Sequence, residues 1–305
     1  MNFFYKLYYL FVRVLLPRTL RVGIRRHWIS YKAKKYSDVW PIDEKAGRSP
    51  KKGNLWHDNK RFALVLTHDV DTGRGQERCP DIMNLEKSLG FTSTFFFVPE
   101  GYSNNFDIHR QLKDNGFELG VHGLNHDGKL YLSRNVFRKR AKAINLHISR
   151  FGASGFRSPC MHHNLEWIQE LDIAYDASTY DTDPFEPQGG GVGTVFPFIV
   201  KDKQSGKSYV ELPYTLPQDF LLFVILKNNN IDLWKRKLDW IAQHGGMALV
   251  ITHPDYMNFT GSASANTEYP ARYYAEFLRY IKGTYDNQYW NATALEIARF
   301  WPKSN

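Results

Sequence analysis

From residue 61 onward, short apolar runs rich in β-branched and aromatic residues alternate with longer stretches of helical periodicity. Runs of this kind, separated by helices, are typical of a parallel sheet that is covered on both faces. In a chain of 305 residues, the alternation predicts an α/β fold built on a barrel related to the (β/α)8 type. The predicted strands are 62–67, 92–98, 117–121, 173–178 and 247–252, and the predicted helices are 81–89, 106–115, 132–150, 162–171, 230–244 and 270–283.

Two regions depart from this alternation. Residues 193–212 place a polar KDKQSGKS segment between two β-rich runs, which predicts a β-hairpin inserted on the barrel. Residues 1–60 are polar and irregular toward their end and carry most of the excess positive charge. We therefore expect a basic N-terminal extension and connector over 1–60 and a barrel domain over 61–305.

The start of the chain has its own pattern. No apolar run reaches the ~18 residues of a transmembrane helix, and no small-residue cleavage site follows the first apolar stretch, which argues against a secretory signal. Residues 1–28 instead predict an amphipathic helix lying on an anionic membrane surface. The alternative is a helix that packs on the main domain. The apolar positions at helical spacing are Phe3, Phe4, Leu7, Leu10, Phe11, Val14 and Leu15.

Composition narrows the class of partner. The formal net charge of +9 favours an anionic partner, but no nucleic-acid-binding signature is present. The 8 Trp, 18 Tyr and 21 Phe suit stacking on sugar rings, although they can equally fill the core.

The two cysteines, Cys79 and Cys160, lack metal-type spacing and are compatible with a reducing compartment. We expect a cytoplasmic protein at the inner face of the membrane.

In a barrel, chemistry belongs at the carboxyl ends of the strands. Polar residues that can bind metal or transfer protons follow four apolar runs directly. They are His68-Asp69-Val70-Asp71, His122 through His126, Arg157-Ser158-Pro159, and His253-Pro254-Asp255.

Asp69 and Asp71 lie two positions apart at a strand end, where i and i+2 point to the same face. Two such carboxylates repel each other, and a bound cation would keep its ligand ionised. One carboxylate as metal ligand and one as general base is a consistent division. In isolation, a solvated loop or a helix cap is the more common explanation of such a pair.

His122 and His126 are four positions apart, the spacing at which two side chains on one helical turn can bind the same ion. A carboxylate completes a set of two His and one Asp that leaves positions open for water and substrate, which is a catalytic arrangement. Arg157 can hold a carboxylate in place, or be a surface residue of a loop. His253 is a candidate general acid, or a structural histidine.

The ordered set THDVD (67–71), HGLNH (122–126), FRSP (156–159) and THP (252–254) resembles the motifs of the polysaccharide deacetylase superfamily, also called the NodB-homology or carbohydrate esterase family 4 group. The resemblance covers about residues 62–255. The usual first motif is Thr-Phe-Asp-Asp-Gly, whereas this chain has Asp-Val-Asp, similar to a branch with some peptidoglycan deacetylases and cofactor-independent allantoinases. ELPYTLPQDF (211–220) and GGMALVITHPDY (245–256) resemble a subgroup associated with bacterial surface-polysaccharide gene clusters.

This resemblance implies a distorted (β/α) barrel of about seven parallel strands. It implies Asp71, His122 and His126 as ligands of a divalent metal, with Zn²⁺ as the first expectation and Co²⁺, Ni²⁺ or Mn²⁺ as alternatives. The family also uses an acidic residue to orient the acid histidine, and either Asp181 or Asp183 fits; we select Asp183. The remaining implied roles are Asp69 as base, Arg157 as the residue that orients the base, and His253 as general acid.

Three functions follow. The first is deacetylation of an N-acetylated sugar, lipid-linked or nucleotide-linked, in surface-polysaccharide or glycolipid biosynthesis. The second is hydrolysis of another C–N bond by the same chemistry, such as a formamido sugar or a ureide. The third is a catalytically silent module that binds a glycan or a membrane.

Overall fold

The computed structural model describes residues 18–36, 38–50, 53, 55–189, 191–202, 205–261 and 266–304. The apolar positions 3–15 of the predicted membrane helix lie outside the described residues. The division into an extension over 1–60 and a barrel over 61–305 stays a prediction.

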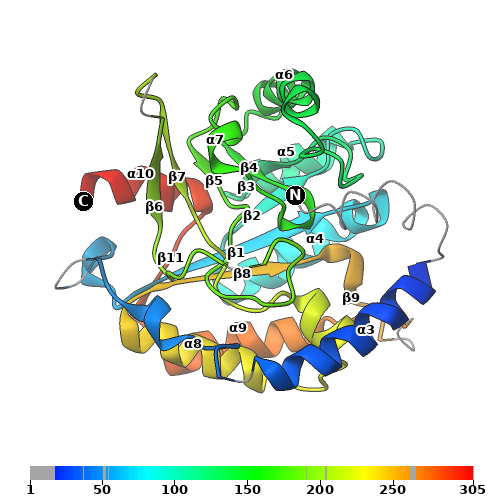
Figure 1. Cartoon of the computed structure of the whole chain (residues 1–305). Coiled ribbons are helices and arrows are strands. Elements are labelled where there is room, and N and C mark those ends of the chain that lie inside the picture. Colours follow the sequence, from blue (N-terminus) through cyan, green and yellow to red (C-terminus); the bar gives the residue numbers. More distant parts are fainter. Residues whose placement is uncertain are drawn as a thin grey trace.

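A single curled sheet forms the centre of the molecule (Figure 1). Its strands follow the order β11-β1-β2-β3-β4-β5-β7-β6, and β8 also pairs with β1. The neighbours are parallel except β6 and β7. The strands are β1 (Phe62–Val70), β2 (Ser93–Phe97), β3 (Glu118–His122), β4 (Gly155–Arg157), β5 (Tyr175–Asp176), β6 (Phe198–Lys201), β7 (Ser208–Glu211), β8 (Met247–Thr252) and β11 (Tyr289–Asn291), and a separate pair is β9 (Met257–Asn258) with β10 (Tyr269–Pro270).

The sheet curls back on itself beyond β7. The backbone N–H groups of Thr215 and Leu216 donate to the carbonyl oxygen of Leu249 in β8, at 3.0 and 3.1 Å. This contact joins the segment after β7 to the opposite side of the sheet. The outcome is a curled, mostly parallel half-barrel, which confirms the predicted α/β barrel-related fold.

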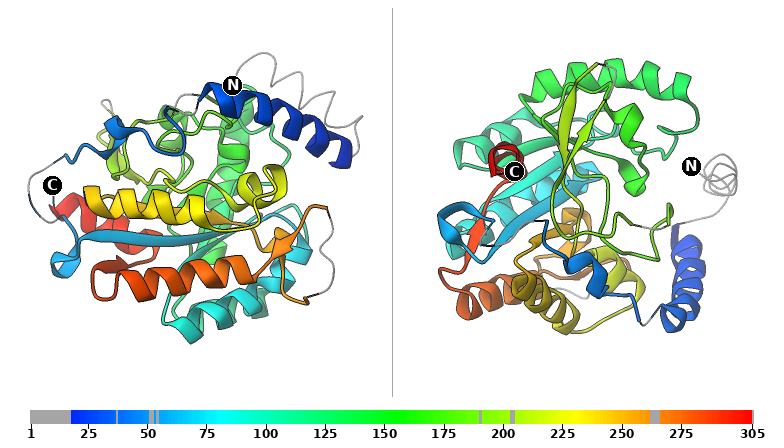
Figure 2. Two further views of the ribbon diagram at one scale, coloured as in Figure 1. Left: turned by 90° about the horizontal axis from the view of Figure 1, so that it is seen from below. Right: turned by 60° about the vertical axis from the view of Figure 1, so that its left-hand side comes forward.

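Helices surround the curled sheet (Figures 1 and 2). α8 and α9 pack together on one side, while α5 and α6 lie against β3 on another. Short 3-10 turns and a π-helical segment connect several elements. The helices are α3 (Arg18–Lys35), α4 (Gly73–Leu89), α5 (Phe106–Asp114), α6 (Arg134–Phe151), α7 (Leu165–Ile168), α8 (Asp232–His244), α9 (Arg272–Thr284) and α10 (Ala294–Ser304), and the turns are η2 (Glu44–Gly47), η3 (His57–Asn59), η4 (Pro159–Met161), the π-helical η5 (Phe220–Ile225) and η6 (Pro254–Tyr256).

β1 is the central strand, and all nine of its residues are buried. Its apolar half packs in the main hydrophobic core, and its polar end enters the site described below. His68 is satisfied internally, because its Nε2 lies 2.9 Å from Glu86 of α4 and its Nδ1 lies 2.7 Å from Thr252 of β8. His68 therefore links β1 to α4 and β8 through hydrogen bonds.

Most predicted elements are observed with shifted ends. α4 begins at Gly73 rather than 81, because the Thr72 hydroxyl caps it by accepting the N–H of Gly75 at 3.4 Å. The helix predicted over 162–171 is reduced to α7. The hairpin predicted over 193–212 is formed by β6 and β7. β11 and α10 at the end of the chain were not predicted.

α3 packs against the barrel near η5. Val22 and Ile29 form a small buried cluster with Phe185, Leu221 and Ile225. This observation supports the second interpretation of the N-terminal region, packing on the main domain, for the part that the structure describes. Among the described helices, none combines the length and the apolar character needed to cross a membrane.

Candidate active site and metal centre

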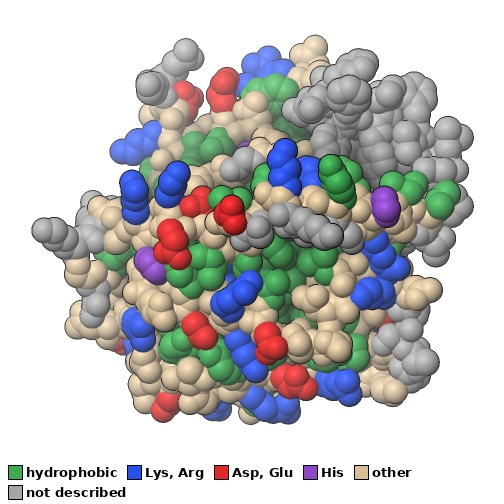
Figure 3. Space-filling model, turned by 60° about the horizontal axis from the view of Figure 1, so that its bottom comes forward, with side chains coloured by type: hydrophobic (Ala, Val, Ile, Leu, Met, Phe, Trp, Pro, Cys, Tyr) green, Lys and Arg blue, Asp and Glu red, His purple; other side chains and the backbone are tan. Residues whose placement is uncertain are grey.

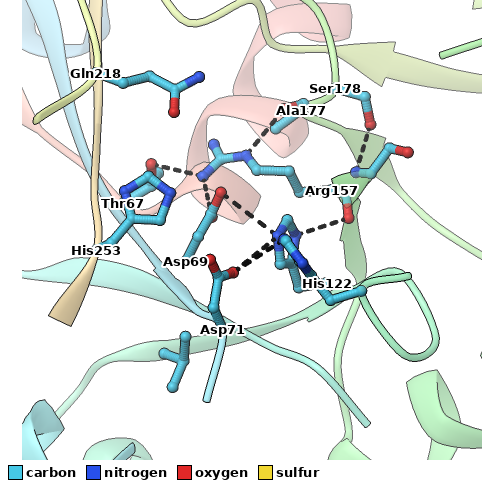
Figure 4. A network of polar contacts seen from close by, with 12 residues as sticks. Thr67, Asp69, Asp71, His122, Arg157, Ala177, Ser178, Gln218 and His253 are labelled. Carbon is cyan, nitrogen blue, oxygen red and sulfur yellow. Dashed lines mark hydrogen bonds and ion pairs between the residues drawn. The ribbon is translucent and has the colours of Figure 1, made fainter. Parts of the chain in front are cut away.

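The polar residues that follow four separate strands meet at one end of the sheet (Figure 4). Strand register brings them together: His122 is paired with Arg157 across β3 and β4, and His68 with Thr252 across β1 and β8. Because these strands are parallel, their carboxyl ends share one edge. The predicted convergence of the four motifs is therefore observed.

Asp71, His122 and His126 form a cluster in which one ligand atom from each lies within 4.8 Å of the others. Oδ1 of Asp71 is 3.5 Å from Nε2 of His122 and 3.2 Å from Nε2 of His126. His122 is further oriented by its Nδ1, which lies 3.1 Å from the Arg157 carbonyl oxygen. With Nδ1–H donating there, Nε2 is left as the coordinating atom.

The two histidines do not share a helical turn, contrary to our expectation. His122 ends β3, and residues 123–128 form a loop. Gly123 starts the loop at φ 64°, where a Cβ atom would also lie 2.5 Å from Pro159. His126 itself adopts a left-handed conformation with φ 48°. The loop, rather than a helix, therefore turns the second imidazole toward Asp71.

The cluster fits a divalent metal on its own geometry. Oδ1 of Asp71 is buried and has no hydrogen-bond donor among the described residues, and its nearest polar neighbours are two imidazole nitrogens. Burial opposes ionisation of Asp71, but the neighbouring His126, His122 and His253 hold its pKa below the usual range. One carboxylate and two imidazoles with open positions match a catalytic Zn²⁺-type donor set.

The carboxylate of Asp69, the predicted base, lies between Arg157 and His122. Its Oδ1 accepts a hydrogen bond of 2.8 Å from Nη1 of Arg157, and its Oδ2 lies 3.8 Å from Nε2 of His122. Burial opposes its charge, but Arg157 and His122 keep its pKa lowered. Asp69 is therefore ionised near neutral pH, as a general base requires.

Arg157 is fully buried, and its hydrogen bonds fix the position of its guanidinium group. Its Nε donates to the Ala177 carbonyl oxygen at 3.0 Å, and its Nη1 donates to Thr67 Oγ1 at 2.9 Å as well as to Asp69. The guanidinium also stacks over Phe96, 4.3 Å from the ring centroid. The predicted contact with a carboxylate is observed, although through one hydrogen bond instead of a pair.

His253 follows β8 and is oriented by Asp219, not by Asp181 or Asp183. Nδ1 of His253 lies 2.7 Å from Oδ1 of Asp219, and its backbone N–H donates to Oδ2 at 2.7 Å. Burial opposes a positive charge on the ring, but Asp219, Asp71 and Asp69 raise the pKa of His253 to about 10. The histidine is therefore protonated near neutral pH and can act as an acid.

Our selection of Asp183 as the orienting carboxylate is corrected by these contacts. Asp183 accepts from the Tyr214 hydroxyl at 3.0 Å, and burial and the neighbouring Glu186 raise its pKa to about 8. Asp181 forms a buried ion pair of 2.6 Å with Lys237. Both carboxylates have other partners because the YDTDP segment pairs with the chain at Tyr214, just after β7, while Asp219 caps η5 beside His253.

Asp255 was among the polar residues predicted at the strand ends, but the sequence assigned it no role. Its Oδ2 accepts the backbone N–H of Asp71 at 3.0 Å, and its Oδ1 accepts the Thr72 hydroxyl. A Cβ atom on Gly75 would lie 2.2 Å from Oδ2, so the absence of a side chain there leaves room for the carboxylate. Asp255 thus restrains the segment that carries Asp71, the candidate metal ligand. Its position two residues after His253 was the available signal.

Comparison with known proteins places this geometry in a family. The family model described as "Polysaccharide deacetylase" matches residues 57–158. A search of curated proteins gave no match.

Solved structures give the fold. A structure described as a probable polysaccharide deacetylase from Pseudomonas aeruginosa PAO1 is 16% identical with a TM-score of 0.65, covering 86% of this chain and 98% of that one. The Puue allantoinase is 16% identical with a TM-score of 0.64, covering 86% and 97%.

A third structure, described as a putative polysaccharide deacetylase from Mycobacterium smegmatis, is 18% identical with a TM-score of 0.61, covering 84% and 95%. The matched family model spans the first two motifs and reaches Ser158, and the fold extends the likeness over most of the chain. Residues 57–158 therefore match the polysaccharide deacetylase family model, and the chain shares the fold of solved structures described as polysaccharide deacetylases over most of its length.

Proposed function

We propose that this protein is a metal-dependent N-deacetylase that hydrolyses the amide of an N-acetylated sugar. The observation that carries the proposal is the arrangement of two groups beside the Asp71–His122–His126 cluster (Figure 4): Asp69, held by Arg157, and His253, held by Asp219. Amide hydrolysis needs both groups, because water must lose a proton and the departing amine must gain one.

Asp71, His122 and His126 would hold the metal. Zn²⁺ is the first candidate, with Co²⁺, Ni²⁺ or Mn²⁺ as alternatives. When bound, a divalent cation polarises the amide carbonyl and lowers the pKa of a neighbouring water.

The chain's own residues would carry the proton transfers. Asp69 would accept the proton of the attacking water, and Arg157 holds Asp69 in place from a fully buried position. His253 would donate its proton to the nitrogen of the breaking C–N bond, using the nitrogen that does not contact Asp219. The products would be a free amine and acetate. Asp69 then releases its proton to solvent and His253 takes one up, which restores the starting state for the next turnover.

Two other functions compete with this proposal. A formamido sugar or a ureide would use the same groups, with formate or a carbamoyl product in place of acetate. A catalytically silent module would need none of them, yet Asp69, Arg157 and His253 are all present and mutually arranged. Their retention supports an enzyme.

The proposal also covers the biosynthetic role of the protein and its contact with a membrane. Resemblance to surface-polysaccharide cluster proteins favours a lipid-linked or nucleotide-linked sugar in polysaccharide or glycolipid biosynthesis. The basic region 1–28 favours peripheral contact with the cytoplasmic face of a membrane.

A mass-spectrometric screen tests the activity. Protein loaded with Zn²⁺ would be incubated with N-acetyl and N-formyl sugars in free, nucleotide-linked and lipid-linked forms. The expected product is lighter by one acetyl group, with no change for the Asp69→Asn variant at equal metal content. Loss of formyl alone would favour the second function, and no loss from any substrate would favour a silent module.

A further inference from the structure

α3 presents an apolar stripe to solvent. Leu20, Ile24, Trp28 and Tyr31 are spaced by four, four and three residues, which places them on one helical face. Their side chains are 51, 55, 39 and 78% exposed. Figure 3 shows hydrophobic side chains along this face, with Lys, Arg and His side chains among them. Contiguous exposed apolar side chains of this kind mark an interaction surface.

The opposite face of α3 is firmly attached to the domain. Val22 and Ile29 are buried in the cluster that includes Leu221. Arg26 donates from Nη2 and Nε to the Val224 carbonyl oxygen at 2.9 and 3.1 Å, and Lys32 donates to the Pro184 carbonyl oxygen at 3.5 Å. The exposed stripe therefore lies on a helix whose orientation is set by the barrel, and it is not required for packing.

Charge identifies the partner. The sequence of α3 carries Arg18, Arg21, Arg25, Arg26, Lys32, Lys34 and Lys35, and no Asp or Glu. An apolar stripe bordered by cations suits insertion among anionic lipid headgroups. A second copy of the chain would fit poorly, because a symmetric contact through this face brings two helices with only positive charges together.

A series of side-chain contacts connects α3 to the candidate active site. The Arg25 guanidinium lies over the Phe220 ring, 5.3 Å from its centroid, and Phe220 directly follows Asp219. Phe220 in turn packs on Tyr256, which packs on His253, with ring centroids 5.1 Å apart in both contacts. Two aromatic side chains in contact, Phe220 and Tyr256, thus connect Arg25 of α3 to the general acid.

We infer that the Leu20–Ile24–Trp28–Tyr31 face of α3 docks on an anionic bilayer and so presents the active site to a lipid-linked sugar. The substrate part of this inference rests on the proposed function, whereas the docking part does not. A lipid-linked substrate is selected over a nucleotide-linked one, because Arg25 of the same helix contacts Phe220 beside Asp219, so a docked bilayer would lie near the site.

The test uses the full chain with vesicles of phosphatidylcholine, with and without phosphatidylglycerol. We expect sedimentation with the anionic vesicles only. Ile24→Glu and Tyr31→Glu should each weaken binding by about tenfold, because each removes a buried apolar contact and adds a repelled charge. The matched control is Leu146→Glu on α6, where the side chain is 73% exposed and binding should be unchanged.

Several outcomes would overturn the inference. One is absence of binding to anionic vesicles, and another is unchanged binding of both α3 variants. A third is a dimer in sedimentation velocity that Ile24→Glu dissociates, which would make a second copy the occupant. Turnover of a soluble N-acetylated sugar separates the two proposals: if it persists without vesicle binding, the docking surface fails while the deacetylase stands.

Discussion

Asp219 holds His253 at two points, through the ring Nδ1 and the backbone N–H, each at 2.7 Å. The Tyr269 hydroxyl donates to the same carboxylate at 2.9 Å. This arrangement fixes the ring orientation and favours its protonated form, as an orienting carboxylate does in other acid–base sites. The pair therefore sets both the direction and the charge of the proposed general acid.

Asp219→Asn should lower the pKa of His253 from its value of about 10. A general acid must be protonated, so activity is lost as pH rises through its pKa. Removing the carboxylate charge should therefore move the alkaline limb of the kcat profile to lower pH and reduce kcat at pH 8 by about 10²-fold. The profile for metal-loaded protein is the measurement.

Tyr269→Phe is the matched control for that experiment. It removes a hydrogen bond to the same carboxylate and leaves the charge on Asp219 in place. We expect a much smaller movement of the alkaline limb. An unchanged profile for Asp219→Asn would show that His253 is not the titrating acid.

The three residues of the proposed metal site could be selected from the sequence because their arrangement is local. Asp71, His122 and His126 each lie at or just beyond the end of an apolar run, and parallel strands bring such ends together. The spacing within 122–126 indicated shared binding, although the physical reason was a loop with a glycine at φ 64° instead of a helix.

The supporting carboxylates were not predictable in the same way. Asp219 lies 34 residues before His253 and reaches it only because the segment between β7 and α8 folds over the barrel end. No periodicity encodes that path. Asp183, which we selected from the YDTDP segment, is turned toward Tyr214. Side-chain direction in an irregular segment depends on tertiary packing, which a single sequence does not reveal.

Asp69→Asn should separate metal binding from chemistry. Asp69 is not in the three-residue cluster, so its variant should keep one bound metal per chain, while loss of the base should lower kcat by about 10²–10⁴-fold. Asp71→Asn is the companion variant and should lose metal. Metal content by mass spectrometry and turnover are measured on the same samples. Full turnover by Asp69→Asn would assign the base elsewhere.

Arg157→Met should destabilise the fold as well as the activity. The side chain is completely buried, and its removal leaves the Asp69 carboxylate without its cation. Breaking such a buried pair costs about 3–5 kcal/mol. Urea unfolding followed by circular dichroism measures the loss.

Arg140→Met supplies the comparison for Arg157. Arg140 pairs with Asp127 at 2.7 Å, but both side chains are partly exposed, at 19 and 28%. Water can solvate the remaining carboxylate, so the expected cost is about 1 kcal/mol or less. Equal losses for the two variants would contradict the view that burial of the Asp69 pair determines its contribution.

Asp255→Ala should weaken metal binding without removing a ligand. The carboxylate of Asp255 accepts the backbone N–H of Asp71 and the Thr72 hydroxyl, so it restrains the segment that presents the Asp71 carboxylate. Residues that orient metal ligands typically contribute about 10–100-fold to metal affinity. We expect a loss of that size in a competition titration with a chromogenic chelator.

Asp127→Ala gives the control for this last experiment. Asp127 is adjacent to the ligand His126 in sequence, yet its carboxylate is directed to Arg140 and Lys129. Both variants remove one negative charge near the site, so a general electrostatic effect would weaken metal binding in both. A loss confined to Asp255→Ala would show that the restraint on Asp71 matters, because only that carboxylate contacts the backbone of a metal ligand.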